Sequence, residues 1–124
     1  MKASVRIELL APVVIRANTS RANMALNNCI GALRMGDTPT CIASARRAAE
    51  CAALAFLASK GIMNPRANWI PRYLLDQPGI EAKRISDRYA ELLMMQVPKG
   101  DAQLFVDKTA EFISNVTLLA QSAL

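Results

Sequence analysis

Arginine side chains are the groups in this chain whose type and spacing could do chemistry. Arg46 and Arg47 interrupt an alanine-rich run, and Arg66 lies three residues before Trp69, the only tryptophan. An arginine can donate two parallel hydrogen bonds to a phosphate, and an aromatic ring can stack on a base. The pattern therefore predicts a patch that contacts phosphate or nucleic acid. Its predicted phosphate contacts are Arg46, Arg47, Arg66 and Arg88, and its predicted stacking residues are Trp69 and Tyr89.

The same arginines also fit a structural interpretation, in which they pair with acidic side chains on solvated helix surfaces. Glu50 lies three residues after Arg47, and Glu91 lies three residues after Arg88. Residues at this spacing are neighbours on a helix, and each such ion pair contributes roughly 0.2–0.5 kcal/mol. The structural interpretation is the simplest one. The sequence also leaves open the phosphate patch and a third interpretation, in which these arginines contact a protein partner.

Catalysis by this chain is not expected, because the residues that most often perform it are missing. The sequence contains no histidine, which removes the commonest general base and a frequent metal ligand. It has no glycine-rich phosphate loop and no nucleophile motif, and no pair of carboxylates falls on one inward helix face. The three cysteines, Cys29, Cys41 and Cys51, form no CxxC pair and are expected to be small apolar core residues. We therefore predict no enzymatic activity, no catalytic residue, no metal site and no cofactor.

Composition indicates a single folded domain over residues 1–124. Apolar residues make up 52% of the chain and charged residues 20%, as is typical of globular proteins. The longest stretches without a charge are residues 22–33 and 112–124, and both are shorter than the roughly 18–20 residues that span a membrane. We therefore expect a cytoplasmic protein with no membrane segment.

The charge is distributed unevenly along the chain. Residues 1–75 contain ten Lys or Arg and three Asp or Glu, a net charge of +7, whereas residues 76–124 contain five and seven, a net charge of −2. The two values sum to the +5 of the whole chain. This asymmetry is compatible with contact to phosphates. The simpler explanation is attraction between two halves of a helical bundle, or between two subunits.

The elements that would position these side chains are predicted to be helices. Residues 41–58 contain eight alanines in eighteen positions. Alanine has the highest helix propensity, and its small side chain lets another backbone approach closely. We expect this segment to be the central, most contacted helix. No segment alternates apolar and polar residues as a half-buried strand would.

Proline and glycine mark the ends of the first two helices. Pro12 fits the first turn of a helix over residues 12–35, and Gly36 ends that helix. The sequence leaves open whether residues 3–11 add a further turn or two that is continuous with it. Thr38 is predicted to cap a second helix, with Pro39 at its first position and its end near residue 60. A connection this short implies an antiparallel hairpin.

The second half of the chain completes the predicted fold. Residues 61–79 contain three prolines and are expected to form a crossover with one short helical turn at residues 69–75. Helices over residues 80–95 and 101–122 follow, the last one capped by Asp101. The prediction is an all-α protein, an antiparallel up-and-down four-helix bundle with a short extra helix between helices 2 and 3.

Apolar side chains at helical spacing are predicted to form the core of this bundle. One end should be covered by the crossover residues Trp69, Ile70, Tyr73 and Leu74. The third and last helices should contribute Ile85, Tyr89, Leu92, Met95, Phe105, Thr109, Phe112, Val116 and Leu119.

One set of motifs resembles a known family. The run ARRAAECA at residues 45–52 continues through Leu57 to a proline-containing crossover and Trp69. Together with Asp87-Arg88-Tyr89 and the break at Pro98, it is similar to the higher-eukaryote-and-prokaryote nucleotide-binding (HEPN) superfamily. The resemblance spans residues 20–120. It implies a four-helix bundle with a short extra helix, and it implies a homodimer.

The resemblance also implies a function, from which this chain departs at one position. Active members of the family cleave RNA with an arginine and a histidine that are separated by four to six intervening residues. Arg88 is similar in position to that arginine, but Leu93, Met94 and Met95 follow where the histidine would stand. The chain therefore looks like a catalytically degenerate member. Other members that do not cleave RNA pair with small nucleotidyltransferases, as in toxin–antitoxin systems, or act as binding modules.

Two functional hypotheses follow. The first is a non-catalytic HEPN-like binding or assembly module that engages a nucleotide, an RNA or a nucleotidyltransferase partner. The alternative is a structural or chaperone-like four-helix bundle that binds another protein and has no nucleotide role. The alternative predicts an exposed apolar stripe, above all on the last helix, and no affinity for phosphate.

Overall fold

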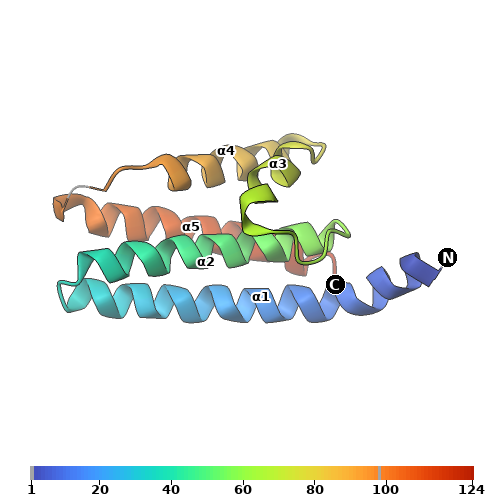
Figure 1. Ribbon diagram of the computed structural model, residues 1–124, viewed down its shortest axis with the longest axis horizontal. Coiled ribbons are helices and arrows are strands. Elements are labelled where there is room, and N and C mark those ends of the chain that lie inside the picture. Colours follow the sequence, from blue (N-terminus) through green and yellow to red (C-terminus); the bar gives the residue numbers. More distant parts are fainter. Residues whose placement is uncertain (1, 98) are drawn as a thin grey trace.

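The regular structure of this protein is helical throughout the part that the structure describes (Figure 1). The computed structural model describes the backbone of residues 2–97 and 99–124, and the side chains of these residues apart from 2–8 and 99. The helices are α1 (Lys2–Arg34), α2 (Thr38–Ser59), α3 (Ile70–Leu75), α4 (Ile80–Met94) and α5 (Ala102–Gln121), with short 3-10 turns at Ala67–Trp69 and Lys99–Asp101. The predicted all-α class is confirmed.

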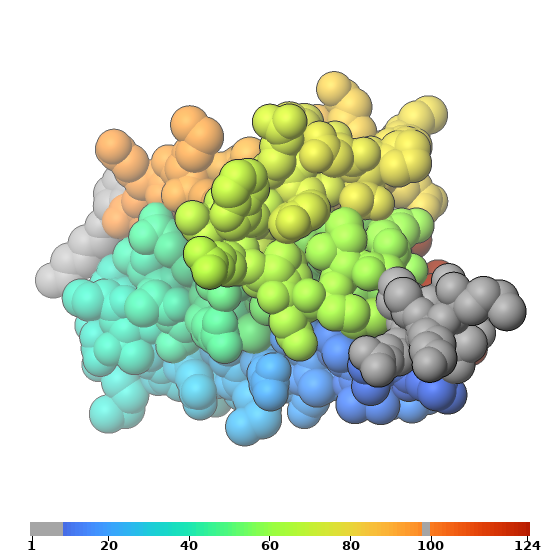
Figure 2. Space-filling view, turned by 45° about the vertical axis from the view of Figure 1, so that its right-hand side comes forward, coloured from blue at the N-terminus to red at the C-terminus, as the bar shows by residue number. Residues whose placement is uncertain are grey.

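Helix α2 lies at the centre of the molecule. It packs along α1 on one side and along α5 on another, and α1 and α5 also touch. Helix α4 contacts α2 and α5 on the side away from α1, and α3 bridges α2 and α4 (Figure 1). In the space-filling view, the crossover and α3 stand forward on the face that they share with α4 (Figure 2). The helix α3 is thus a short extra element between two long helices.

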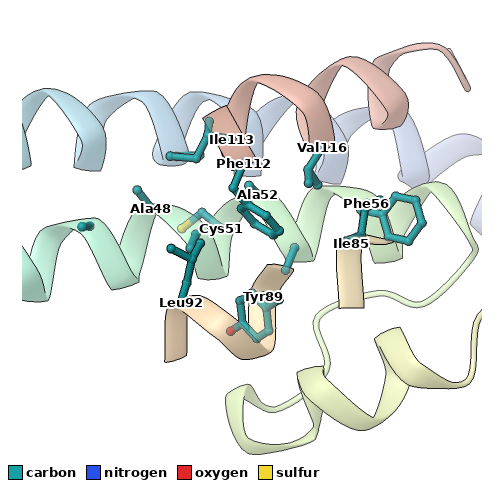
Figure 3. Packing of buried hydrophobic residues seen from close by; sticks show 14 of the residues in the cluster. Ala48, Cys51, Ala52, Phe56, Ile85, Tyr89, Leu92, Phe112, Ile113 and Val116 are labelled. Carbon is teal, nitrogen blue, oxygen red and sulfur yellow. The ribbon is translucent and has the colours of Figure 1, made fainter. Parts of the chain in front are cut away.

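The alanine-rich composition explains why α2 holds this central place. Ala48, Ala52 and Ala55 are completely buried, and half of the 22 residues of the helix are buried. A methyl side chain keeps neighbouring helices close, and larger residues from those helices fill the remaining space. Phe112 and Tyr89 pack against the α2 surface around Ala52 in this way (Figure 3).

Glycine ends α1 as predicted. Gly36 has φ +72°, and its N–H donates to the Leu33 carbonyl at 3.1 Å. The Asp37 N–H donates to the Ala32 carbonyl at 2.9 Å, which completes a Schellman motif. Gly61, with φ +84°, ends α2 through the same pair of bonds. Only glycine adopts this left-handed conformation without strain.

Two predicted helix starts were wrong. Pro12 lies inside α1, which begins ten residues earlier at Lys2. A proline inside a helix removes one backbone hydrogen bond and bends the helix. Figure 1 shows that the N-terminal end of α1 turns away from the axis of the rest of the helix. The cap of α2 is Asp37 and not Thr38, because the Asp37 carboxylate accepts the Thr40 N–H at 3.2 Å.

Two further details of the prediction need correction. Asp101 precedes α5, but its side chain makes no capping hydrogen bond. In the crossover, Ile70 and Leu74 are buried as expected, whereas Trp69 is 52% exposed and Tyr73 is 37% exposed. Trp69 lies in the 3-10 turn before α3, and Tyr73 lies at the edge of the α3 face that carries the buried Ile70 and Leu74. No helix among the described residues is both long enough and apolar enough to cross a membrane.

Candidate functional site

The four arginines of the predicted patch differ in what they contact. Arg46 turns toward the connection between α4 and α5: its Nη2 donates to the Met95 carbonyl at 3.2 Å. Its guanidinium carbon also lies 5.8 Å from the centre of the Phe105 ring, within range of a cation–π interaction. Arg46 therefore holds two elements together and is already engaged within the protein.

The next two arginines have different surroundings. Arg47 donates to Glu50 at 2.9 Å, which is the surface ion pair that the structural interpretation predicts. Arg66 is exposed and precedes the 3-10 turn that carries Trp69. Trp69 itself is 52% exposed, so its ring could stack on a ligand.

Tyr89 cannot take the stacking role predicted for it. Its side chain is only 3% exposed, and its ring centre lies 6.0 Å from that of Phe112. Burial raises the pKa of the Tyr89 hydroxyl to about 12, and the charges of Glu50 and Cys51 act in the same direction. Tyr89 is therefore a core residue, as its helical spacing with Ile85 and Leu92 had also indicated (Figure 3).

Arg88, the fourth predicted contact, lies in a groove between α4 and α5. This α4–α5 groove has a volume of about 440 Å³. Its floor is apolar and formed by buried side chains, whereas Leu118 at its edge is 67% exposed. The floor residues are Ile85, Leu92, Phe112 and Val116, with Leu118 and Leu119 toward one end.

The rim of the groove carries both signs of charge in equal number. Three basic and three acidic residues line it: Arg84, Arg88 and Lys108, and Glu81, Glu91 and Glu111. One pair spans the groove, because Lys108 Nζ of α5 lies 2.7 Å from Glu91 Oε1 of α4. The hydrogen bond and the charge of Lys108 lower the pKa of the Glu91 carboxyl. The groove thus has an apolar floor and a rim without net charge.

None of the three cysteines lines the α4–α5 groove. All three cysteines are free and buried, and burial raises the pKa of Cys51, so its thiolate is disfavoured. Among the described residues, no three side chains of His, Cys, Asp or Glu come together in a way that could hold a metal ion.

Comparison with known proteins adds no relative. The chain matches no family model, and no curated protein or solved structure is significantly similar to it.

Sequence reasoning identified Arg88 but not the groove that contains it. The floor residues were predicted to be core residues, because their helical spacing indicates that they are buried. The spacing does not indicate whether another helix covers them or whether they line a groove. One available signal was Leu118, an apolar residue outside the predicted inward face of the last helix. Its exposure agrees with the apolar stripe that the protein-binding alternative predicts for this helix.

Proposed function

We propose that this protein is a non-catalytic helical binding module and that its α4–α5 groove binds an amphipathic helix of a protein partner. The observation that carries this proposal is a groove with an apolar floor, an exposed leucine (Leu118) at its edge and a rim of mixed charge. Helix-in-groove recognition uses this combination: an apolar face fills the groove, and flanking charges set the orientation.

The length of the groove supports a helical occupant. Its walls comprise residues 81–92 of α4 and 108–119 of α5, which is about three turns of each helix, or roughly 16 Å. An occupant helix of three turns would place apolar residues at i, i+3 or i+4, and i+7 along this length. Leu118 at the groove edge would lose its exposed area to such a partner.

The charges of the rim favour a protein over a nucleic acid. Arg84 and Arg88 offer two guanidinium groups one turn apart on α4, but Glu81 and Glu111 stand beside them and would repel a phosphate. A partner helix with acidic residues opposite the arginines and basic residues opposite the glutamates would complement both. Nucleic-acid sites, by contrast, are strongly positive.

The HEPN resemblance remains part of this proposal as an expectation about kinship and architecture. The architecture would be an up-and-down four-helix bundle, with α1, α2, α4 and α5 as its long helices and α3 as the extra one. Among the partners that the resemblance implies, a protein of the nucleotidyltransferase kind fits a helix-binding groove better than a free nucleotide or an RNA does. The expected homodimer is a competing occupant of the same groove.

Site-specific photo-crosslinking tests the proposal. A benzoylphenylalanine is placed at residue 118, inside the groove, and as a matched control at residue 104, where Leu104 is 50% exposed on α5 but outside the groove lining. We expect an adduct at position 118 alone, formed with an amphipathic segment of another protein. A synthetic peptide of that segment should bind the native protein at least about tenfold more weakly after Leu118→Asp, and normally after Leu104→Asp.

Three results would contradict the proposal. Equal adducts at both positions would indicate non-specific contact, and an adduct with a second copy of this chain would make the groove a homodimer interface. Binding of ATP or a fluorescent oligoribonucleotide that Arg88→Glu abolishes would assign the groove to a nucleotide or RNA.

A further inference from the structure

Two cysteine thiols meet inside the hairpin of α1 and α2. The Sγ atoms of Cys29 in α1 and Cys41 in α2 lie 3.5 Å apart, and both side chains are completely buried. The two residues are separated by twelve positions in sequence, with the α1–α2 turn between them. This contact is distinct from the groove and plays no part in the proposed function.

We propose that Cys29 and Cys41 are an oxidative modification site, at which thiol oxidants such as peroxides close a disulfide that links α1 to α2. The sulfur atoms come from two different helices and already face each other. An S–S bond of about 2.0 Å requires them to approach by a further ~1.5 Å. Small shifts of two side chains and of the helix end that carries Cys41 can supply this distance.

The reaction balances with hydrogen peroxide as oxidant. One cysteine sulfur, as its thiolate, attacks a peroxide oxygen; the O–O bond breaks, the sulfur becomes a sulfenic acid, and the departing oxygen takes up protons to leave as water. The second thiolate attacks the sulfenic sulfur, the S–S bond forms as the S–O bond breaks, and the departing hydroxide takes up one proton to leave as a second water. The two thiols have then lost two electrons and two protons in total, and the peroxide has become two waters.

Access to the pair is expected to depend on opening at the start of α2. Cys41 lies in the first turn of this helix, next to the Asp37 cap, and helix ends open more readily than helix centres. Burial, followed by the contact with Cys41, raises the pKa of Cys29 to about 12, so the closed protein contains almost no thiolate at this position. Oxidation should therefore be slow and limited by local opening.

Cys51 provides an internal control. It lies in the middle of α2 and is as completely buried as the other two. Its sulfur makes no hydrogen-bond contact with another thiol among the described residues. If burial alone determined how a thiol reacts with oxidants, Cys51 would be oxidised in the same way as Cys29 and Cys41. If the distance between sulfur atoms determines it, only Cys29 and Cys41 will form a disulfide.

The experiment uses the full chain, both as the wild type, in which Cys51 should stay out of the disulfide, and with Cys51→Ala. Each protein is treated with diamide under native conditions and at low protein concentration. Diamide accepts two electrons and two protons and spares the methionines. We expect a monomer lighter by about 2 Da, a crosslinked peptide containing Cys29 and Cys41, and an unfolding midpoint raised by roughly 5–10 °C, all reversed by dithiothreitol. The double variant Cys29→Ala, Cys51→Ala should show none of these changes.

Several results would overturn the proposal. Full alkylation of both thiols after diamide treatment and denaturation would show that no disulfide forms. Crosslinked dimers without the lighter monomer would show that the sulfurs pair between molecules. A disulfide that forms only in urea would show that the folded geometry does not bring the sulfurs together productively.

Discussion

The guanidinium of Arg46 donates a hydrogen bond to the backbone carbonyl of Met95, 3.2 Å away, and thereby ties α2 to the end of α4. Met95 follows the last residue of α4, and its carbonyl lies outside the helical hydrogen-bond ladder. The same guanidinium lies over the ring of Phe105 in α5. One side chain thus joins three helices at one end of the molecule.

Replacing Arg46 should lower stability, whereas replacing its neighbour should not. We expect Arg46→Ala to lower the free energy of unfolding by about 1 kcal/mol, because it removes a hydrogen bond and a cation–π contact. Arg47→Ala loses one exposed ion pair and should cost less than about 0.5 kcal/mol. Urea unfolding of both variants measures the difference. Equal values would mean that Arg46 is a surface residue like Arg47.

Replacing a buried alanine of α2 by a larger residue should lower the stability of the protein. Ala52 is completely buried at the centre of the core, so Ala52→Leu would force neighbouring helices apart and lower the free energy of unfolding by about 1–3 kcal/mol. Ala43 is exposed on the same helix, and Ala43→Leu should be close to neutral. Thermal or urea unfolding distinguishes the two. A tolerated Ala52→Leu would show that the packing around α2 is loose.

Tyr89 should make the protein sensitive to alkaline pH. Its folded-state pKa of about 12 lies above the usual value of 10, so the stabilisation by its neutral form is complete below pH 10 and is lost as the pH rises from 10 to 12. Over this range we expect the wild type to lose more unfolding free energy than Tyr89→Phe. Parallel slopes for the two proteins would contradict the burial of this hydroxyl.

The ion pair between Glu91 and Lys108 should make the stability of the protein depend on pH in the acidic range. Lys108 lowers the pKa of Glu91 from 4.5, so the pair stabilises the folded state above that pH and loses its effect as the pH falls through the lowered value. Lys108→Gln should cost less than about 1 kcal/mol at pH 7, because the pair is partly exposed. The difference from the wild type, as measured by urea unfolding, should shrink as the pH falls below 4.5 and through the lowered pKa of Glu91. A constant difference would mean that Lys108 acts through packing alone.

The local features of this fold were predictable because each depends on a few adjacent residues. Gly36 ends α1 since only a glycine takes the required left-handed conformation, and the alanine run forms the central helix because of its propensity and its volume. The misplaced cap of α2 shows the limit of such reasoning. Asp37 and Thr38 are both good capping residues, and only the path of the backbone decides which side chain reaches the Thr40 N–H.

The candidate sites depended on contacts between residues far apart in sequence. The sequence by itself determined an all-helical protein with a small-residue central helix, no histidine and a set of arginines. Only the tertiary structure decided that Arg46 is engaged by Met95, that Tyr89 is buried, and that Arg88 lines a groove. It also brought Cys29 and Cys41 together across a helical hairpin. The physical reason is that helical spacing defines which residues share a face of a helix. The packing of the helices decides whether that face is buried, is bonded to another part of the chain, or is accessible to a partner.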